Sequence, residues 1–121
     1  MIGIIEAFVR EYIMQKDLPG IGANVYLERP EEAPDRYILI EKTGSGREEL
    51  LDSAVLAVQS LSRNRMYEAA ETNERVKAAL LAMPEETEVF SCELNTDYNY
   101  TNTETKEYRY QAVFQIDYRI R

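Results

Sequence analysis

Apolar and polar side chains alternate along the last stretch of the chain, residues 108–120. The apolar positions of this alternation are Tyr108, Tyr110, Ala112, Phe114, Ile116, Tyr118 and Ile120. Successive side chains of a strand point to opposite faces of its sheet, so the pattern predicts a strand whose even-numbered residues are packed in the core. Such a strand is longer than the usual length of about five or six residues, and we expect it to run past the edge of its own sheet.

Two segments place apolar residues at the three- and four-residue spacing of an amphipathic helix. The first covers residues 2–16, where the stripe consists of Ile2, Ile5, Phe8, Val9, Tyr12 and Ile13. Pro19 and Gly20 follow and predict its end. The second begins near Arg63, with a stripe of Met66, Ala69, Ala70, Asn73, Val76, Leu80 and Met83, and we expect Pro84 to end it.

Residues 24–28 and 37–41 predict two short strands, separated by a turn that contains Pro30 and Pro34. We expect these strands to pair as an antiparallel hairpin. The following segment, residues 43–49, is rich in glycine and polar residues and has no apolar anchor, which predicts a flexible loop.

Residues 54–58 are apolar without interruption, a pattern typical of a central strand that is covered on both faces. Residues 88–94 predict a fourth strand. Between it and the last strand, residues 95–106 are polar and rich in Asn and Thr. We expect an exposed β-hairpin tip there, because Thr and Tyr favour extended backbone.

The predicted fold class is α+β, with the element order α-β-β-β-α-β-β. Residues 1–121 form one α+β domain in this prediction, with two helices, a single antiparallel or mixed sheet of about five strands and a projecting hairpin at about residues 95–106. Two helices leave one face of such a sheet uncovered within the chain. Edges and faces of this kind are commonly covered by a neighbouring subunit.

The charge balance narrows the choice of partners. The chain has 14 Lys and Arg against 22 Asp and Glu, which gives a formal net charge of −8 and a pI near 4.6. Tight binding to duplex DNA depends on Lys and Arg that neutralise phosphates, so this balance argues against it. Two interpretations remain: a solvated acidic surface, or an acidic wall past which nucleic acid slides.

The single cysteine, Cys92, rules out a disulfide within the chain and indicates a reducing, intracellular setting. Its apolar neighbours predict that it is a small core residue. The N-terminal residues lack a basic region, and Glu6, Arg10 and Glu11 interrupt any apolar run. We expect neither a signal peptide nor a membrane span there.

Residue types that carry catalysis are scarce. The chain has no histidine, which excludes histidine-based acid/base catalysis and histidine metal sites. Glu48, Glu49 and Asp52 could act as a carboxylate pair, but a solvated loop is the simpler interpretation. The residues at positions 95, 97 and 99 share the spacing of a calcium loop, whereas Tyr100 and Lys106 replace its glycine and glutamate. We therefore predict no catalytic residues, no metal site and no cofactor.

The tyrosines and the odd-numbered residues of the last strand suggest protein contacts. Five of the nine tyrosines lie in the last 24 residues. Tyr98 and Tyr100 belong to the polar segment, and either contact another protein or stabilise the hairpin by cross-strand pairing. The predicted subunit-interface candidates are Tyr98, Tyr100, Arg109, Gln111, Gln115 and Arg119.

Several stretches together resemble a known family. They are Tyr-Leu-Glu-Arg-Pro at residues 26–30, Tyr-Ile-Leu-Ile-Glu-Lys-Thr-Gly at 37–44, Ala-Val-Gln-Ser-Leu-Ser-Arg at 57–63, Glu-Ala-Ala at 68–70 and Tyr-Arg-Tyr-Gln-Ala-Val-Phe at 108–114. In order and spacing, this pattern resembles the tail terminator and head-tail joining (minor capsid) proteins of tailed bacteriophages and prophages.

The resemblance implies a structural virion component without enzymatic activity, assembled in the bacterial cytoplasm. It implies a homo-oligomeric ring, commonly a hexamer, that caps the tail tube and joins it to the head. The implied partners are the tail tube protein and head connector proteins, with no membrane, and DNA would pass through without specific binding. An acidic lumen fits such passage, and Glu48 and Glu49 are our lumen-loop candidates.

Three alternatives remain open. The first is a head-completion protein or another minor capsid subunit. The second is a small acidic module that docks on a basic host protein. The third is a hydrolase that uses Glu48 or Asp52.

Overall fold

The computed structural model describes residues 2–105 and 107–119. Lys106, which ends the predicted hairpin tip, and Ile120, which ends the predicted last strand, lie outside the described residues. The elements are α1 (Ile5–Gln15), β1 (Val25–Tyr26), β2 (Arg36–Glu48), β3 (Leu51–Ser62), α2 (Met66–Glu86), β4 (Val89–Asn99) and β5 (Tyr108–Arg119). This order confirms the predicted α-β-β-β-α-β-β arrangement and the α+β class.

The five strands form one mixed sheet in the order β1-β2-β3-β5-β4. β3 is central, as predicted, and pairs antiparallel with both β2 and β5. β4 pairs antiparallel with β5 and is an edge strand. The prediction of an antiparallel hairpin at residues 24–41 is wrong, because β1 runs parallel to β2, with Val25 opposite Ile38. The segment between the two strands is an excursion that returns the chain to its starting end, which a parallel pair requires.

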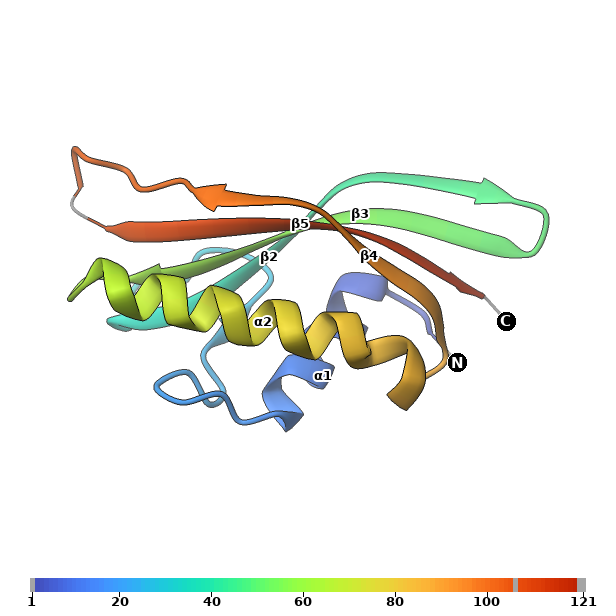
Figure 1. Ribbon diagram of the computed structural model, residues 1–121, viewed down its shortest axis with the longest axis horizontal. Helices are drawn as coiled ribbons and strands as arrows, with labels where there is room; N and C mark the ends of the chain where they lie inside the picture. Colours follow the sequence, from blue (N-terminus) through green and yellow to red (C-terminus); the bar gives the residue numbers. More distant parts are fainter. Residues whose placement is uncertain (1, 106, 120–121) are drawn as a thin grey trace.

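The prediction of a flexible loop at residues 43–49 is also wrong. These residues continue β2, which pairs with β3 up to Glu48 and Leu51 across a short turn. Gly44 and Gly46 lie opposite Val55 and Ser53, and the side chains of β3 fill the space beside them. Figure 1 shows that this β2–β3 hairpin reaches past both helices, so it is the long projecting hairpin of the fold. We call residues 43–54 the arm.

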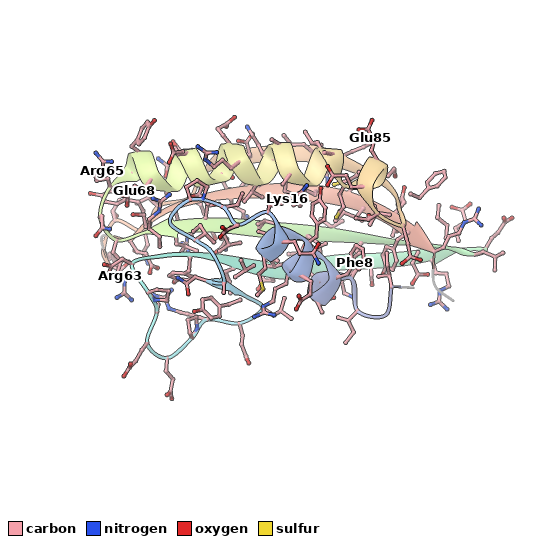
Figure 2. The ribbon with its side chains drawn as sticks, turned by 90° about the horizontal axis from the view of Figure 1, so that it is seen from below. Phe8, Lys16, Arg63, Arg65, Glu68 and Glu85 are labelled. Atoms are coloured by element: carbon pink, nitrogen blue, oxygen red, sulfur yellow. The ribbon has the colours of Figure 1, made fainter. Side chains whose placement is uncertain are left out.

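Both helices pack on one face of the sheet, which we call the inner face (Figure 2). The even-numbered residues of β5 behave largely as predicted: Ala112, Phe114, Ile116 and Tyr118 are buried there, whereas Tyr108 and Tyr110 are only half-buried. The buried stripe of α1 includes Ile5, Val9, Tyr12 and Ile13. Apolar burial of this kind stabilises the fold by about 25 cal/mol for each Å² removed from water. The core therefore lies between the helices and the inner face.

The prediction that Pro84 ends the second helix is wrong, since α2 continues to Glu86. Proline lacks an N–H group, so Pro84 removes one hydrogen bond of the last turn without stopping the helix there. The amide and the hydroxyl of Thr87 both donate to the carbonyl oxygen of Met83, each at 2.9 Å, and close the end.

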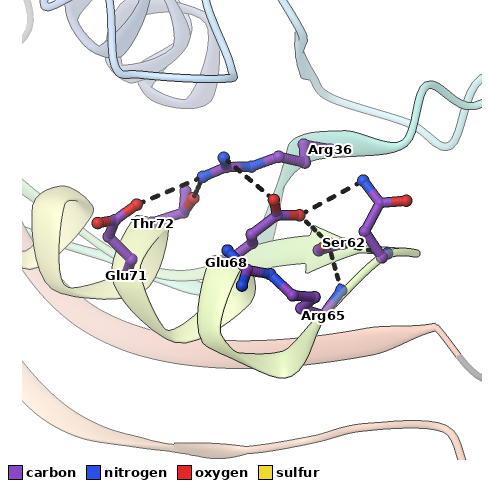
Figure 3. A network of polar contacts seen from close by, with 7 residues as sticks. Arg36, Ser62, Arg65, Glu68, Glu71 and Thr72 are labelled. Atoms are coloured by element: carbon purple, nitrogen blue, oxygen red, sulfur yellow. Dashed lines mark hydrogen bonds and ion pairs between the residues drawn. The ribbon is translucent and has the colours of Figure 1, made fainter.

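Arg36 connects β2 to the first turns of α2 (Figure 3). Its guanidinium donates to Thr72 at 3.0 Å and lies 3.8 Å from carboxylate oxygens of Glu68 and Glu71. Glu68 accepts a 2.8 Å hydrogen bond from Ser62, and this bond, with the Arg36 charge, lowers the pKa of the Glu68 carboxyl. Gly20 has a φ of +76° and lies against Arg36, where a Cβ atom would come within 2.5 Å of the guanidinium. The network therefore joins four segments of the chain.

A second polar cluster lies on the opposite face of the sheet, at the start of β5. The buried carboxylate of Glu107 accepts two hydrogen bonds from Arg29, each at 3.1 Å, and one from Tyr37 at 3.1 Å. Arg63 lies 3.8 Å from the same carboxylate. Burial and the Glu107 charge raise the pKa of the Tyr37 hydroxyl. Glu107 thus holds the β1–β2 connection and the β3–α2 turn against β5.

Replacing Glu107 by Gln should lower the free energy of unfolding by about 2 kcal/mol, because hydrogen bonds to a charged group are lost while the side chain keeps its shape. Urea unfolding followed by circular dichroism would measure the change. Glu104→Gln is the matched control, since Glu104 is exposed on the same hairpin, and it should change stability little. Equal stability of the two variants would contradict the role given to Glu107.

Candidate functional site

The face of the sheet opposite the helices, which we call the outer face, is not covered by either described helix. One register row crosses all five strands on this face. It runs through Tyr26, Leu39, Gln59, Gln111 and Tyr98, each opposite the next on a neighbouring strand. The central part of the row is therefore built by residues that are far apart in the sequence.

Hydrogen bonds orient the polar half of this row. The Gln59 amide donates to the Gln111 carbonyl oxygen at 2.8 Å, and the Gln111 amide donates to the Tyr98 hydroxyl at 2.5 Å. Tyr98 as a whole residue remains 40% exposed. A tyrosine held by its hydroxyl, with its ring in solvent, offers a large contact area at a small cost in side-chain entropy.

Tyr100 and Arg109 extend the polar corner of the outer face. The Arg109 guanidinium lies 4.4 Å from the centre of the Tyr100 ring and donates to the Tyr100 carbonyl oxygen at 2.9 Å. The rings of Tyr98 and Tyr100 meet edge to face, with centres 5.7 Å apart. Four of the six predicted interface residues, Tyr98, Tyr100, Arg109 and Gln111, thus form one contiguous group, which we call the tyrosine corner.

The other two predicted residues, Gln115 and Arg119, lie on the same side of β5 but farther along it. Gln115 is opposite Val55 and Glu93, and Arg119 is opposite Leu51. At about 3.3 Å per residue, Arg119 lies roughly 26 Å from Gln111 along the strand. The structure therefore divides the predicted set between the tyrosine corner and the arm.

Glu48 and Glu49, the lumen-loop candidates, lie at the tip of the arm. Glu49 occupies the turn with a φ of +57°. Together with Leu50, Leu51, Phe90 and Arg119, they line a shallow open groove. Asp52 does not join them, because its carboxylate is paired with Arg47 at 2.6 Å.

Sequence reasoning missed two exposed apolar residues near this groove, Leu50 and Phe90. Leu50 is 80% exposed in the turn of the arm, and Phe90 is 64% exposed. Phe90 lies in an irregularity of β4, where the pairing shifts between Val89 and Ser91. Two adjacent apolar residues at 89 and 90 break the alternation, and this was the available signal for a bulge.

Cys92 is a core residue, as predicted, and lies opposite Ile116 on the inner side of β4. Cys92 is buried and free, and burial raises the pKa of its thiol to about 12, with a further contribution from the Glu93 charge. The thiol is therefore protonated near neutral pH. In the described part of the chain, no three side chains of Cys, Asp and Glu gather closely enough to hold a metal ion. Neither described helix is long and apolar enough to cross a membrane.

Comparison with known proteins shows a similarity of fold to solved structures. No protein-family model matches the chain, and no curated protein matches it. Among solved structures, a chain of the virion of a native gene transfer agent (GTA) particle is similar, with a TM-score of 0.63 and 12% sequence identity. The similarity covers 94% of this chain and 86% of that chain. At this identity, the two chains share a fold.

Alkylation of Cys92 at pH 8 should be slower in the folded protein than in the urea-unfolded protein by roughly a hundredfold or more, because the raised pKa and burial suppress the thiolate. A time course of iodoacetamide labelling, quenched at intervals and analysed by mass spectrometry, would measure both rates. Rapid labelling of the folded protein would contradict the buried position of the thiol.

Proposed function

We propose that this protein is a structural component of a tailed-phage or prophage virion, and that its copies form a ring, in the simplest case a hexamer, that terminates the tail tube and joins it to the head. The observation that carries this proposal is the shared fold with a chain of a gene transfer agent virion, which extends over 94% of the present chain. The tail tube protein and head connector proteins would then be its neighbours. Assembly in the bacterial cytoplasm follows from the same proposal.

A structural rather than enzymatic role agrees with the chemistry of the described residues. The thiol of Cys92 is protonated and buried, and Asp52 is neutralised by Arg47. The groove beside Glu48 and Glu49 is open to solvent, so it does not enclose a substrate or exclude water. The proposed role requires neither catalytic residues nor a cofactor.

The outer face supplies a surface for contact between subunits. Tyr98 and Tyr100 are large, partly exposed and held in place by hydrogen bonds and ring contacts. Tyrosine and arginine in such settings often dominate the binding energy of an interface. We assign the tyrosine corner to a contact between neighbouring copies, with Gln115 and Arg119 as further contact residues.

The arm provides a candidate wall for the lumen of the ring. It projects beyond the helices (Figure 1) and carries Glu48 and Glu49 at its tip. Acidic side chains around a channel repel the phosphates of passing DNA, so DNA moves through without being held.

A second candidate is an acidic module that docks on a basic protein of the host. The net charge of −8 favours it, because such a charge speeds association with a basic surface. A head-completion protein or another minor capsid subunit fits the same shared fold. A pull-down that recovers one host protein in stoichiometric amount and no tail protein would favour the docking module.

Purified protein, alone or mixed with tail tube protein, should form ring-shaped oligomers in negative-stain electron microscopy. Combining Tyr98→Ala with Tyr100→Ala should weaken assembly by about tenfold or more in light-scattering titrations, because interface tyrosines commonly contribute over 1 kcal/mol each. Tyr67→Ala is the matched control, since Tyr67 is 65% exposed on α2, away from the outer face. Equal assembly of the double variant and the control would remove the tyrosine corner from the interface.

Reversing the charge at the arm tip with Glu49→Lys should reduce DNA delivery by assembled particles while leaving ring formation intact, because Glu49 lies in the turn and outside β2. A lysine there would attract phosphates and slow the passing DNA. The measurement is the titre of DNA-transferring particles, compared with a Glu85→Lys variant on α2. An unchanged titre would show that the arm tip does not face the DNA path.

A further inference from the structure

The sheet has two free edges that lie on opposite sides of the molecule. One is β4, which pairs only with β5 along its whole length in the described part of the chain. The other is the half of β2 that leads into the arm, because β1 pairs with Ile38 and Leu39 only. Residues 41–48 of β2 therefore have a strand on one side and none on the other. An unpaired edge presents N–H and C=O groups that can pair with another strand.

The directions of the strands make these two edges complementary. β2, β3, β5 and β4 alternate in direction across the sheet, since each neighbouring pair is antiparallel. A second copy placed beside the first in the same orientation would set its β4 antiparallel to the free part of β2. The alternation would then continue from one copy to the next. β4, with eleven residues, is also long enough to pair along all of residues 41–48 of β2.

The charges on the edges distinguish this pairing from pairing between two identical edges. β4 carries Glu93 and Asp97 and has no Lys or Arg. Asp97 is already paired with Lys77 of α2 at 3.0 Å, whereas Glu93 is exposed. Two β4 edges side by side would bring the Glu93 side chains of two copies together with no basic residue of β4 between them, and like charges on neighbouring strands are destabilising. The free part of β2 carries Lys42 and Arg47 beside Glu41 and Glu48, so it has no net charge. Arg47 is paired with Asp52, whereas Lys42 makes no ion pair with any described residue. The β2 edge is thus the better partner for β4.

We propose that copies of this protein associate head to tail through their sheet edges, with β4 of one copy pairing antiparallel with residues 41–48 of β2 of the next. This inference rests on the proposed ring and specifies the contact that builds it. Because the two edges are different surfaces, the contact is heterologous, and repeating it generates a closed ring or a filament. The tyrosine corner lies at the end of β4, so the same contact brings Tyr98 close to the neighbouring copy.

Cross-linking of single-cysteine variants tests which edges meet. In a Cys92→Ser background, Glu41→Cys places a thiol on the free part of β2, and Glu93→Cys places one on β4. Both positions are exposed. The two variants, one with a C-terminal tag to distinguish its mass, are co-expressed and treated with a short bismaleimide. Arg75→Cys, on the exposed side of α2, is the control partner for each. Circular dichroism confirms that each variant is folded.

Head-to-tail pairing predicts cross-linked dimers that contain one copy of each variant, and no dimers from either variant alone or with Arg75→Cys. Dimers of Glu93→Cys with itself would show β4–β4 pairing and overturn the inference. If oligomers form but no mixed dimers are cross-linked, the inferred edge pairing is wrong, whereas the proposed ring is not contradicted. A protein that stays monomeric, alone and with tail tube protein, would overturn both the inference and the proposed function.

A charge substitution at the same edge gives an independent readout. Lys42→Glu should raise the dissociation constant of the oligomer by about two- to fivefold for each interface. The substitution adds a third acidic residue, after Glu41 and Glu48, to the β2 edge that faces β4. Arg75→Glu changes the net charge equally on α2 and should leave the dissociation constant close to that of the unchanged protein. Equal effects of the two substitutions would show that net charge, rather than the β2 edge, controls assembly.

Discussion

The packing of both helices on a single face of the sheet is the constraint on which the rest of the structure depends. The inner face buries Phe114, Ile116 and Leu56 against α1 and α2, and this burial is the main favourable term in folding a chain of this size. With only two helices available, the opposite face has no helical cover. The outer face and the two edges are therefore consequences of how the core is built.

Polar side chains hold the regions that the core does not reach. Arg36 joins β2, the first turns of α2 and the loop at Gly20, and Glu107 holds two connections against the start of β5. Both clusters lie toward the same ends of β2, β3 and β5, where the strands enter or leave the sheet. At the opposite ends, the polar contacts of the described residues are smaller, such as the Arg47–Asp52 ion pair, and the strands extend into the arm, beyond the helices (Figure 1). One end of the molecule is thus fastened, and the other presents a bare hairpin.

This division suits a subunit whose role is assembly. A scaffold with a rigid core can hold the tyrosine corner, the β4 edge and the arm in fixed relative positions, which limits the entropy lost when copies associate. The chain that shares this fold belongs to the virion of a gene transfer agent particle, and the proposed function extends that role to the present protein. Under the proposed ring, the edges would contact neighbours and the acidic arm tip would face the passing DNA.

Local pattern was sufficient for features that depend on one segment alone. The alternation at residues 108–120 identified β5 and its buried face, the apolar spacing identified both helices, and the apolar surroundings of Cys92 identified its burial. The order of elements followed from these. The local pattern also indicated Tyr98, Arg109 and Gln111 as surface candidates, but it did not predict that these residues contact one another.

Only the tertiary structure decided how the strands pair. Gly44 and Gly46 favour a loop by their local preferences, yet β3 lies alongside and supplies hydrogen bonds that make them part of β2. The parallel direction of β1 and the row that brings Gln59, Gln111 and Tyr98 together likewise depend on partners far away in the sequence. A strand is stabilised by its neighbours rather than by its own residues, so a single sequence determines which segments are strands more readily than which strands meet.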